Sequence, residues 1–269
     1  MATVNKSEVI AENIKILIDQ VSKGGSEALV KYLDFMGRFH QYSFGNALWI
    51  ATQMPSATQV AGYNAWKKMG RFVKAKEKGI RILAPIIISK PDPTDKLDQK
   101  SRLAGFRVVY VFDVSQTEGE AIPEFVKATG EPGENLARLH AFLESKGIGV
   151  SYDESIAPSL GASRGGSIVL LPGQTKAEEF ATLVHETAHE LLHKRDKDTP
   201  KPSKTKREVE AEAVAFVVGR AIGLEMGSSS SDYIHLYLGD AEALTKSLEA
   251  IQTASSEIIK AITKTDKEK

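Results

Sequence analysis

The stretch TLVHETAHELLH, Thr182–His193, decides how we interpret the fold of this 269-residue chain. Its segment HETAH, His185–His189, fits the pattern H-E-x-x-H, which is typical of a metal-binding helix. Histidines four residues apart lie on one helix face, about 6 Å apart along the axis, so both imidazoles can approach one tetrahedral ion. Glu186 follows the first histidine, where its carboxylate can reach a water beside the metal. Because so short a pattern also arises by chance, the prediction depends on the rest of the chain.

The residues before the motif predict a strand and a defined helix start. The run SIVLLP, Ser167–Pro172, is a predicted strand, and Gly161–Leu171 is the region expected to form a sheet edge for an extended peptide, as in zincin folds. A further strand is predicted at Ile148–Tyr152. Thr175 and Glu178 are spaced as in a capping box, so the motif helix is expected to begin there.

Composition limits the chemistry of any metal site. The chain has no cysteine, which excludes disulfides and cysteine-based zinc ribbons, so the ligands must be histidines and carboxylates. With 42% hydrophobic and 26% charged residues, the chain is expected to be globular. No apolar run approaches the roughly 18 residues of a membrane span, and the first residues do not resemble a secretory signal. We therefore predict no membrane partner and a cytoplasmic location.

A third protein ligand is expected on the next predicted helix, Arg207–Gly223. Glu208 and Glu212 share one face because they are four residues apart, whereas Glu210 points elsewhere. The pattern E-x-E-A-E-A-V-A on this helix resembles the matching helix of gluzincin-like and ImmA/IrrE-type metallopeptidases. That resemblance implies that Glu208 is the zinc ligand and that Glu212 orients a histidine ligand. The main alternative is that Glu212 is itself the zinc ligand.

A third histidine, His193, follows His189 by another four residues. Side chains on three successive turns span about 12 Å along the axis, which is too far for all three to bind one tetrahedral ion. We therefore predict that His193 packs in the core or supports a ligand from outside the coordination sphere.

The charge distribution suggests two modules. Residues 1–118 hold 17 basic and 11 acidic side chains, whereas residues 119–269 hold 18 basic and 24 acidic ones. An asymmetry of this kind suggests different partners for the two halves. Residues 120–134 are rich in Gly, Pro and acidic residues, as linkers often are. We predict an N-terminal domain at 1–119, a linker at 120–134 and a second domain at 135–269.

Basic and aromatic residues alternate after Gly62. The candidate nucleic-acid contacts are Tyr63, Trp66, Lys67, Lys68, Arg71, Lys74, Lys76 and Lys78. Basic side chains can bind phosphates, and aromatic rings can stack on the bases of a single strand. The alternative is that the basic residues form a solvated face and the rings lie in the core.

Two longer blocks carry a family resemblance. Tyr42–Pro85, YSFGNALWIATQMPSATQVAGYNAWKKMGRFVKAKEKGIRILAP, and Phe112–Gly119, FDVSQTEG, resemble the N-terminal domain of ArdC-type antirestriction proteins. The resemblance implies a domain that binds single-stranded DNA, followed by a zincin-like metallopeptidase domain. Strands are also predicted at Ile80–Ile88 and Gly105–Val114, paired antiparallel. The expected fold class is therefore α+β, with a helical and β-hairpin DNA-binding domain before a gluzincin-like zincin domain.

The sequence thus predicts an antirestriction-type protein of a plasmid or mobile element. It would bind single-stranded DNA and carry a zinc metallopeptidase that cleaves an unknown protein substrate, with another divalent metal as a possible substitute for zinc. Glu186 is the predicted general base. Tyr233, His235 and Tyr237 are candidates to stabilise the oxyanion. The alternative is a protein that coats single-stranded DNA and whose metal-binding domain is structural, and a third possibility is a regulatory protease that cleaves a repressor.

Overall fold

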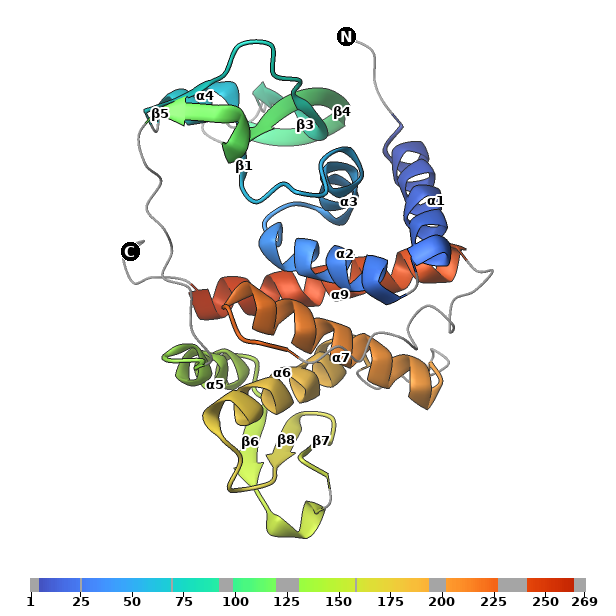
Figure 1. Cartoon of the computed structure of the whole chain (residues 1–269). Coiled ribbons are helices and arrows are strands. Elements are labelled where there is room, and N and C mark those ends of the chain that lie inside the picture. The colour runs from blue at the N-terminus through green and yellow to red at the C-terminus, as the bar shows by residue number, and fades with distance from the viewer. Residues whose placement is uncertain are drawn as a thin grey trace. The chain divides into compact units, whose positions relative to one another are not determined.

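The computed structural model describes residues 5–24, 26–68, 70–91, 99–119, 131–157, 159–193, 202–226 and 241–263 (Figure 1). Its contacts divide the chain into two compact units. The first unit comprises Met1–Leu17 and Gly45–Ile122, and the second comprises Ile18–Phe44 and Pro123–Lys269. Helices and strands occur in both units, as the predicted α+β class requires.

The first unit is built around an antiparallel sheet. Its elements are α1 (Lys6–Gly24, which continues into the second unit), α3 (Phe44–Gln53), β1 (Val60–Gly62), α4 (Tyr63–Lys68), β2 (Arg71–Val73), β3 (Ile80–Pro91), β4 (Gln99–Asp113), η1 (Val114–Gln116) and β5 (Thr117–Gly119). The main sheet has the order β1-β4-β3, and β2 pairs with β5 in a separate two-stranded sheet. Ile80 lies opposite Val111 at one end of the β3–β4 hairpin, which confirms the predicted antiparallel pairing.

Helix α3 is attached to strand β3 of this sheet through two amide side chains, those of Asn46 and Gln53. Asn46 donates its amide to the carbonyl of Leu83 at 2.9 Å and accepts the N–H of the same residue at 2.8 Å. Because the amide side chain satisfies both backbone groups of one strand residue, it acts as a local substitute for a neighbouring strand.

The second unit combines five helices with a small mixed sheet among the described residues. Its elements are α2 (Ser26–Arg38), α5 (Asn135–Ser145), β6 (Gly149–Tyr152), η2 (Glu154–Ile156), β7 (Gly161–Ser163), β8 (Ser167–Leu170), α6 (Lys176–Leu192), α7 (Lys204–Ala221) and α9 (Ala241–Thr263). The sheet order is β6-β8-β7, with β6 parallel and β7 antiparallel to β8. β7 is therefore an edge strand in the first part of the predicted edge region, Gly161–Leu171, whereas β8 in the second part is the central strand.

The motif helix α6 begins where the sequence predicts. Thr175 is its N-cap, and the capping box is complete because Glu178 and Thr175 bond each other's backbone N–H groups. The buried apolar face of α6 carries Phe180, Leu183 and Val184.

Helix α2 comes early in the chain but packs in the second unit. It contacts α7 and α9. At Gly37, a Cβ would lie 2.8 Å from the carbonyl oxygen of Val217, so the α2 backbone approaches α7 as closely as only glycine allows. The contact-based units thus differ from the predicted sequence domains in residues 18–44.

No helix in the described ranges has both the length and the apolar character needed to span a membrane.

Candidate metal centre

Three of the predicted site residues come together between α6 and α7. The Nε2 atoms of His185 and His189 are 3.1 Å apart, and a carboxylate oxygen of Glu208 lies 3.4 Å from the first and 3.5 Å from the second. With ligand bonds of about 2.0–2.1 Å, two ligands of a tetrahedral ion are separated by about 3.3 Å. The three donor atoms therefore have the spacing and the N/O chemistry of a site for a divalent first-row metal. Among the described residues, His185, His189 and Glu208 are the group that meets this geometry.

The electrostatic environment favours the neutral form of the imidazole that metals bind. Burial and, to a smaller extent, the neighbouring His185 together lower the pKa of His189 to about 4, while Glu208 acts in the opposite direction. At pH 7 the His189 ring is therefore neutral, as a metal ligand must be.

Glu186 lies beside these ligands and is 7% exposed. Burial raises the pKa of its carboxyl group to about 7, against an ordinary value of 4.5. A hydrogen bond from the backbone N–H of Ser163 acts against this shift, and the charges of Glu208 and Glu190 add to it. A carboxyl group with this pKa can both accept and release a proton near neutral pH.

A neighbouring carboxylate holds β7 in place beside the motif helix. Glu190 is 4% exposed, and one oxygen accepts the Ser163 hydroxyl at 2.5 Å and the Gly165 N–H at 2.8 Å. Its other oxygen accepts the Gly166 N–H at 2.7 Å. These bonds connect the β7–β8 turn to α6, and they keep Ser163 where its backbone can reach Glu186.

Gly161 permits the close approach of β7 to α6. A Cβ at this position would lie 2.7 Å from the Thr182 methyl group and 2.9 Å from Cγ of Glu186. Both distances are shorter than carbon atoms tolerate, so a side chain here would displace the strand or the carboxylate.

A cleft of about 360 Å³ opens next to Glu186. Its lining is mainly apolar, with one carboxylate from α7. The lining residues are Leu160, Gly161, Ala181, Thr182, His185, Glu186, Glu212, Ala215, Phe216 and Met226. The cleft is next to Gly161 of β7, and Glu186 lies in its wall.

Glu212 does not have the predicted role. It is exposed in the cleft, and within the described chain it makes no hydrogen bond or ion pair with a histidine. The α7 acid that contacts His193 is Glu210, which is 5% exposed and lies 2.9 Å from Nε2 of that histidine. On α7, Glu210 rather than Glu212 is thus the acid in contact with His193.

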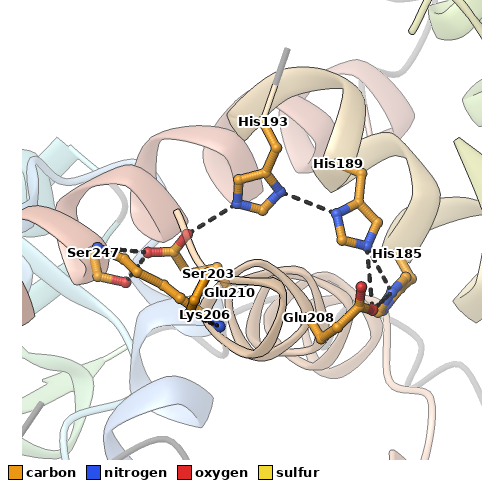
Figure 2. A network of polar contacts seen from close by, with 8 residues as sticks. All are labelled: His185, His189, His193, Ser203, Lys206, Glu208, Glu210 and Ser247. Atoms are coloured by element: carbon orange, nitrogen blue, oxygen red, sulfur yellow. Dashed lines mark hydrogen bonds and ion pairs between the residues drawn. The ribbon is translucent and has the colours of Figure 1, made fainter. Parts of the chain in front are cut away.

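The structure places His193 behind the donor set rather than in it (Figure 2). Its Nδ1 is 3.0 Å from Nδ1 of His189, and its Nε2 faces Glu210. This agrees with the prediction that His193 is not a ligand. The partner Glu210 was missed because helical spacing describes only one helix, and this contact joins two.

In the first unit, Trp66 is not available to a base. Its ring is fully buried, and its indole N–H donates to the carbonyl of Phe112 at 2.8 Å. The predicted stacking role of Trp66 is thus corrected to a core role. Tyr63 is 54% exposed and remains a candidate for stacking.

The basic candidates differ in how the fold uses them. Arg71 donates to the hydroxyl and carbonyl oxygens of Thr117, and Lys74 donates to the carbonyl of Ser115 at 2.9 Å. These two residues therefore connect strand β2 and the residue after it to η1 and β5. The four others are exposed: Lys67, Lys68, Lys76 and Lys78. Tyr233, His235 and Tyr237 lie outside the described residues.

Fold and site together define an α+β protein with a candidate metal centre of two histidines and one glutamate. Residues 7–123 match the family described as the N-terminal domain of anti-restriction factor ArdC, so this part of the chain is similar to that domain. This confirms the resemblance carried by residues 42–85 and 112–119.

Two solved structures share the fold over 94% of this chain and 97% of their own. They are the antirestriction ArdC protein from plasmid R388 in metal-free form (17% identity, TM-score 0.57) and in Mn(II)-bound form (16% identity, TM-score 0.54). The uncharacterized protein pXO2-81 of Bacillus anthracis is 24% identical over 314 residues. That match includes 97% of this chain but only 53% of the relative, so the chain spans about half the length of this curated protein.

Proposed function

We propose that this chain is an antirestriction protein whose second unit is a metal-dependent peptidase and whose first unit binds single-stranded DNA. The observation that carries the peptidase is the group His185, His189 and Glu208, at tetrahedral spacing, with Glu186 next to it. The Mn(II)-bound form of the R388 protein supports a divalent cation, and zinc suits the same donors. The names of the R388 structures support the antirestriction role and an origin on a plasmid.

A divalent cation held by the three donors would polarise a peptide carbonyl and make a water molecule more acidic. Glu186 is placed to take the proton of the attacking water and to pass it to the leaving amine. The Ser163 N–H keeps the carboxylate oriented, and burial brings its pKa to about 7, where both transfers are accessible. The cleft beside β7 has room for a substrate residue, with its apolar wall against the side chain.

The test of the peptidase is Glu186→Gln. The variant is expected to bind Zn²⁺ or Mn²⁺ as the wild type does, because Glu186 is not one of the donors. Cleavage of an unstructured protein such as casein should fall about 10²–10⁴-fold, the usual contribution of a positioned general base. Equal cleavage by both proteins would refute the role of Glu186. If the metal-loaded wild type cleaves neither casein nor a random peptide library, the alternative of a structural metal domain is favoured.

The DNA-binding part rests on the exposed lysines around α4 and the turn before β3, together with the exposed ring of Tyr63. We expect Lys67, Lys68 and Lys78 to contact phosphates. For single strands the slope of log K against log salt is about 0.7 per neutralised phosphate, so replacing all three by Gln should reduce the slope by about 2.

The matched control for this triple variant replaces three exposed lysines elsewhere with Gln: Lys15, Lys176 and Lys204. It has the same net charge, but its affinity for an oligonucleotide and its salt slope should stay close to those of the wild type. An equal loss in both variants would mean that net charge, and not this surface, binds DNA. Adding a chelator to the wild type then shows whether DNA binding needs the metal centre.

A further inference from the structure

We propose that His193 and Glu210 are positioning residues that set the orientation of His189 at the candidate metal centre. The proposal rests on the metal site of the proposed function and adds residues to it that do not touch the cation. We call His193, Glu210 and Ser247 the relay, because they form a continuous row of contacts that ends at His189 (Figure 2).

The relay joins three helices in the interior of the second unit. His193 follows the last residue of α6, Glu210 lies on α7, and Ser247 lies on α9. The side chains of His193 and Glu210 are 3% and 7% exposed. Nδ1 of His193 is 3.0 Å from His189, its Nε2 is 2.9 Å from one oxygen of Glu210, and the other oxygen accepts the Ser247 hydroxyl at 2.5 Å.

A buried carboxylate and imidazole are costly to keep unless each polar atom has a partner. Here each imidazole nitrogen of His193 and each oxygen of Glu210 has one. Lys206, 3.9 Å from Glu210, adds a positive charge at the far end of the relay. The arrangement therefore holds the His193 ring in one orientation.

The order of donors in the relay determines which nitrogen of His189 carries a hydrogen. Two ring nitrogens in contact need one donor and one acceptor. The Glu210 carboxylate is an acceptor, so Nε2 of His193 donates to it, and Nδ1 of His193 is left to accept. Nδ1 of His189 must then donate. Its Nε2 keeps the lone pair, and this is the atom that lies 3.1 Å from His185 and 3.5 Å from Glu208.

The relay thus presents the lone pair of His189 to the place where the cation would bind. Partners of this kind fix the tautomer and the ring angle of a metal-ligating histidine, and losing them typically costs about 10–100-fold in metal affinity. His185 has no comparable relay among the described contacts, so the effect is expected at His189.

The test measures the Zn²⁺ and Mn²⁺ dissociation constants of the full chain by calorimetry. His193→Phe keeps a ring but removes both nitrogens, and Glu210→Leu removes the acceptor at similar volume. Both are expected to raise the dissociation constant about 10–100-fold. Glu210→Gln keeps an oxygen that can accept from His193, so it should rescue most of the affinity.

Glu190→Leu is the matched control. Glu190 is as buried as Glu210 and follows His189 directly in α6, but its bonds go to the β7–β8 turn. The control should lower the melting temperature and leave the dissociation constant within about threefold of the wild type. Loss of affinity in the relay variants without loss in Glu190→Leu separates positioning from a general loss of stability.

Nitrogen NMR of the histidine rings gives a second readout that needs no variant to fold. In the chelator-treated wild type, His189 should carry its hydrogen on Nδ1 and His193 on Nε2. The opposite tautomers, or unchanged affinity in a folded His193→Phe protein, would overturn the proposal. If the wild type and His185→Ala take up the cations equally weakly, the metal centre fails and the proposed function fails with it. If His185→Ala loses affinity for the cations but the His193 and Glu210 variants do not, the metal centre stands and only the proposed role of the relay is refuted.

Discussion

Replacing Glu186 with Gln should stabilise the chelator-treated protein at high pH and have little effect at low pH. The carboxyl group has a pKa of about 7 in the fold, mainly because it is buried, and an ordinary value of 4.5 in the unfolded chain. A raised pKa means that the folded state holds the proton more tightly. The contribution of this carboxyl group to the free energy of unfolding is fully present below pH 4.5 and is lost as the pH rises through 7.

The magnitude follows from the shift. One pKa unit corresponds to about 1.4 kcal/mol, so a change from 4.5 to about 7 corresponds to at most about 3.5 kcal/mol. Gln resembles the protonated acid and does not ionise, so it avoids the cost of a buried charge. Relative to wild type, we expect Glu186→Gln to gain about 1–3 kcal/mol in unfolding free energy at pH 8 and almost nothing at pH 4.5.

Urea denaturation at several pH values, followed by circular dichroism with chelator present, measures the difference. Glu144→Gln on α5 is the control, because Glu144 is exposed and its replacement should change the free energy of unfolding equally at both pH values. A Glu186→Gln protein that is no more stable than wild type at pH 8 would show that the carboxylate is not held in a costly environment.

Three further substitutions test the packing. Gly161→Ala places a methyl group 2.7 Å from Thr182, so thermal unfolding should report a loss of about 1–3 kcal/mol, whereas Gly149→Ala on β6 meets no atom within 4 Å and should cost little. Gly37→Ala should cause a similar loss through its contact with Val217, and a neutral result would argue against packing of α2 on α7. Trp66→Phe removes a buried hydrogen bond and ring volume, so the free energy of unfolding should fall by about 1–3 kcal/mol. Its affinity for single-stranded DNA should be unchanged. A clear loss of affinity would restore Trp66 as a DNA contact.

Much of the local structure is predictable because it depends on neighbours in sequence. The start of α6 follows from the Thr175 and Glu178 capping box, and the β3–β4 hairpin follows from two β-branched runs. Trp66 was harder, because a ring next to lysines suits either a stacked base or a core. Its burial and its bond to Phe112 depend on the position of strand β4, in which Phe112 lies 46 residues after Trp66 in the chain.

The glutamates of α7 also show that sequence spacing cannot predict contacts between two helices. Spacing correctly separates Glu208 and Glu212 from Glu210, but it does not say which histidine lies opposite each face. That choice depends on how α7 crosses α6 and on α9, which brings Ser247 to the other oxygen of Glu210.

The sequence by itself therefore determined the two histidines, the glutamate between them and the α+β class, because helix periodicity and strand patterns are properties of short segments. Only the tertiary structure brings Glu208 rather than Glu212 to the two histidines, holds β7 against α6 through Glu190, and puts His193 and Glu210 behind His189. These contacts join segments that no local rule connects. Their geometry is set by the packing of whole helices, where a shift of one residue would bring a different side chain to each partner.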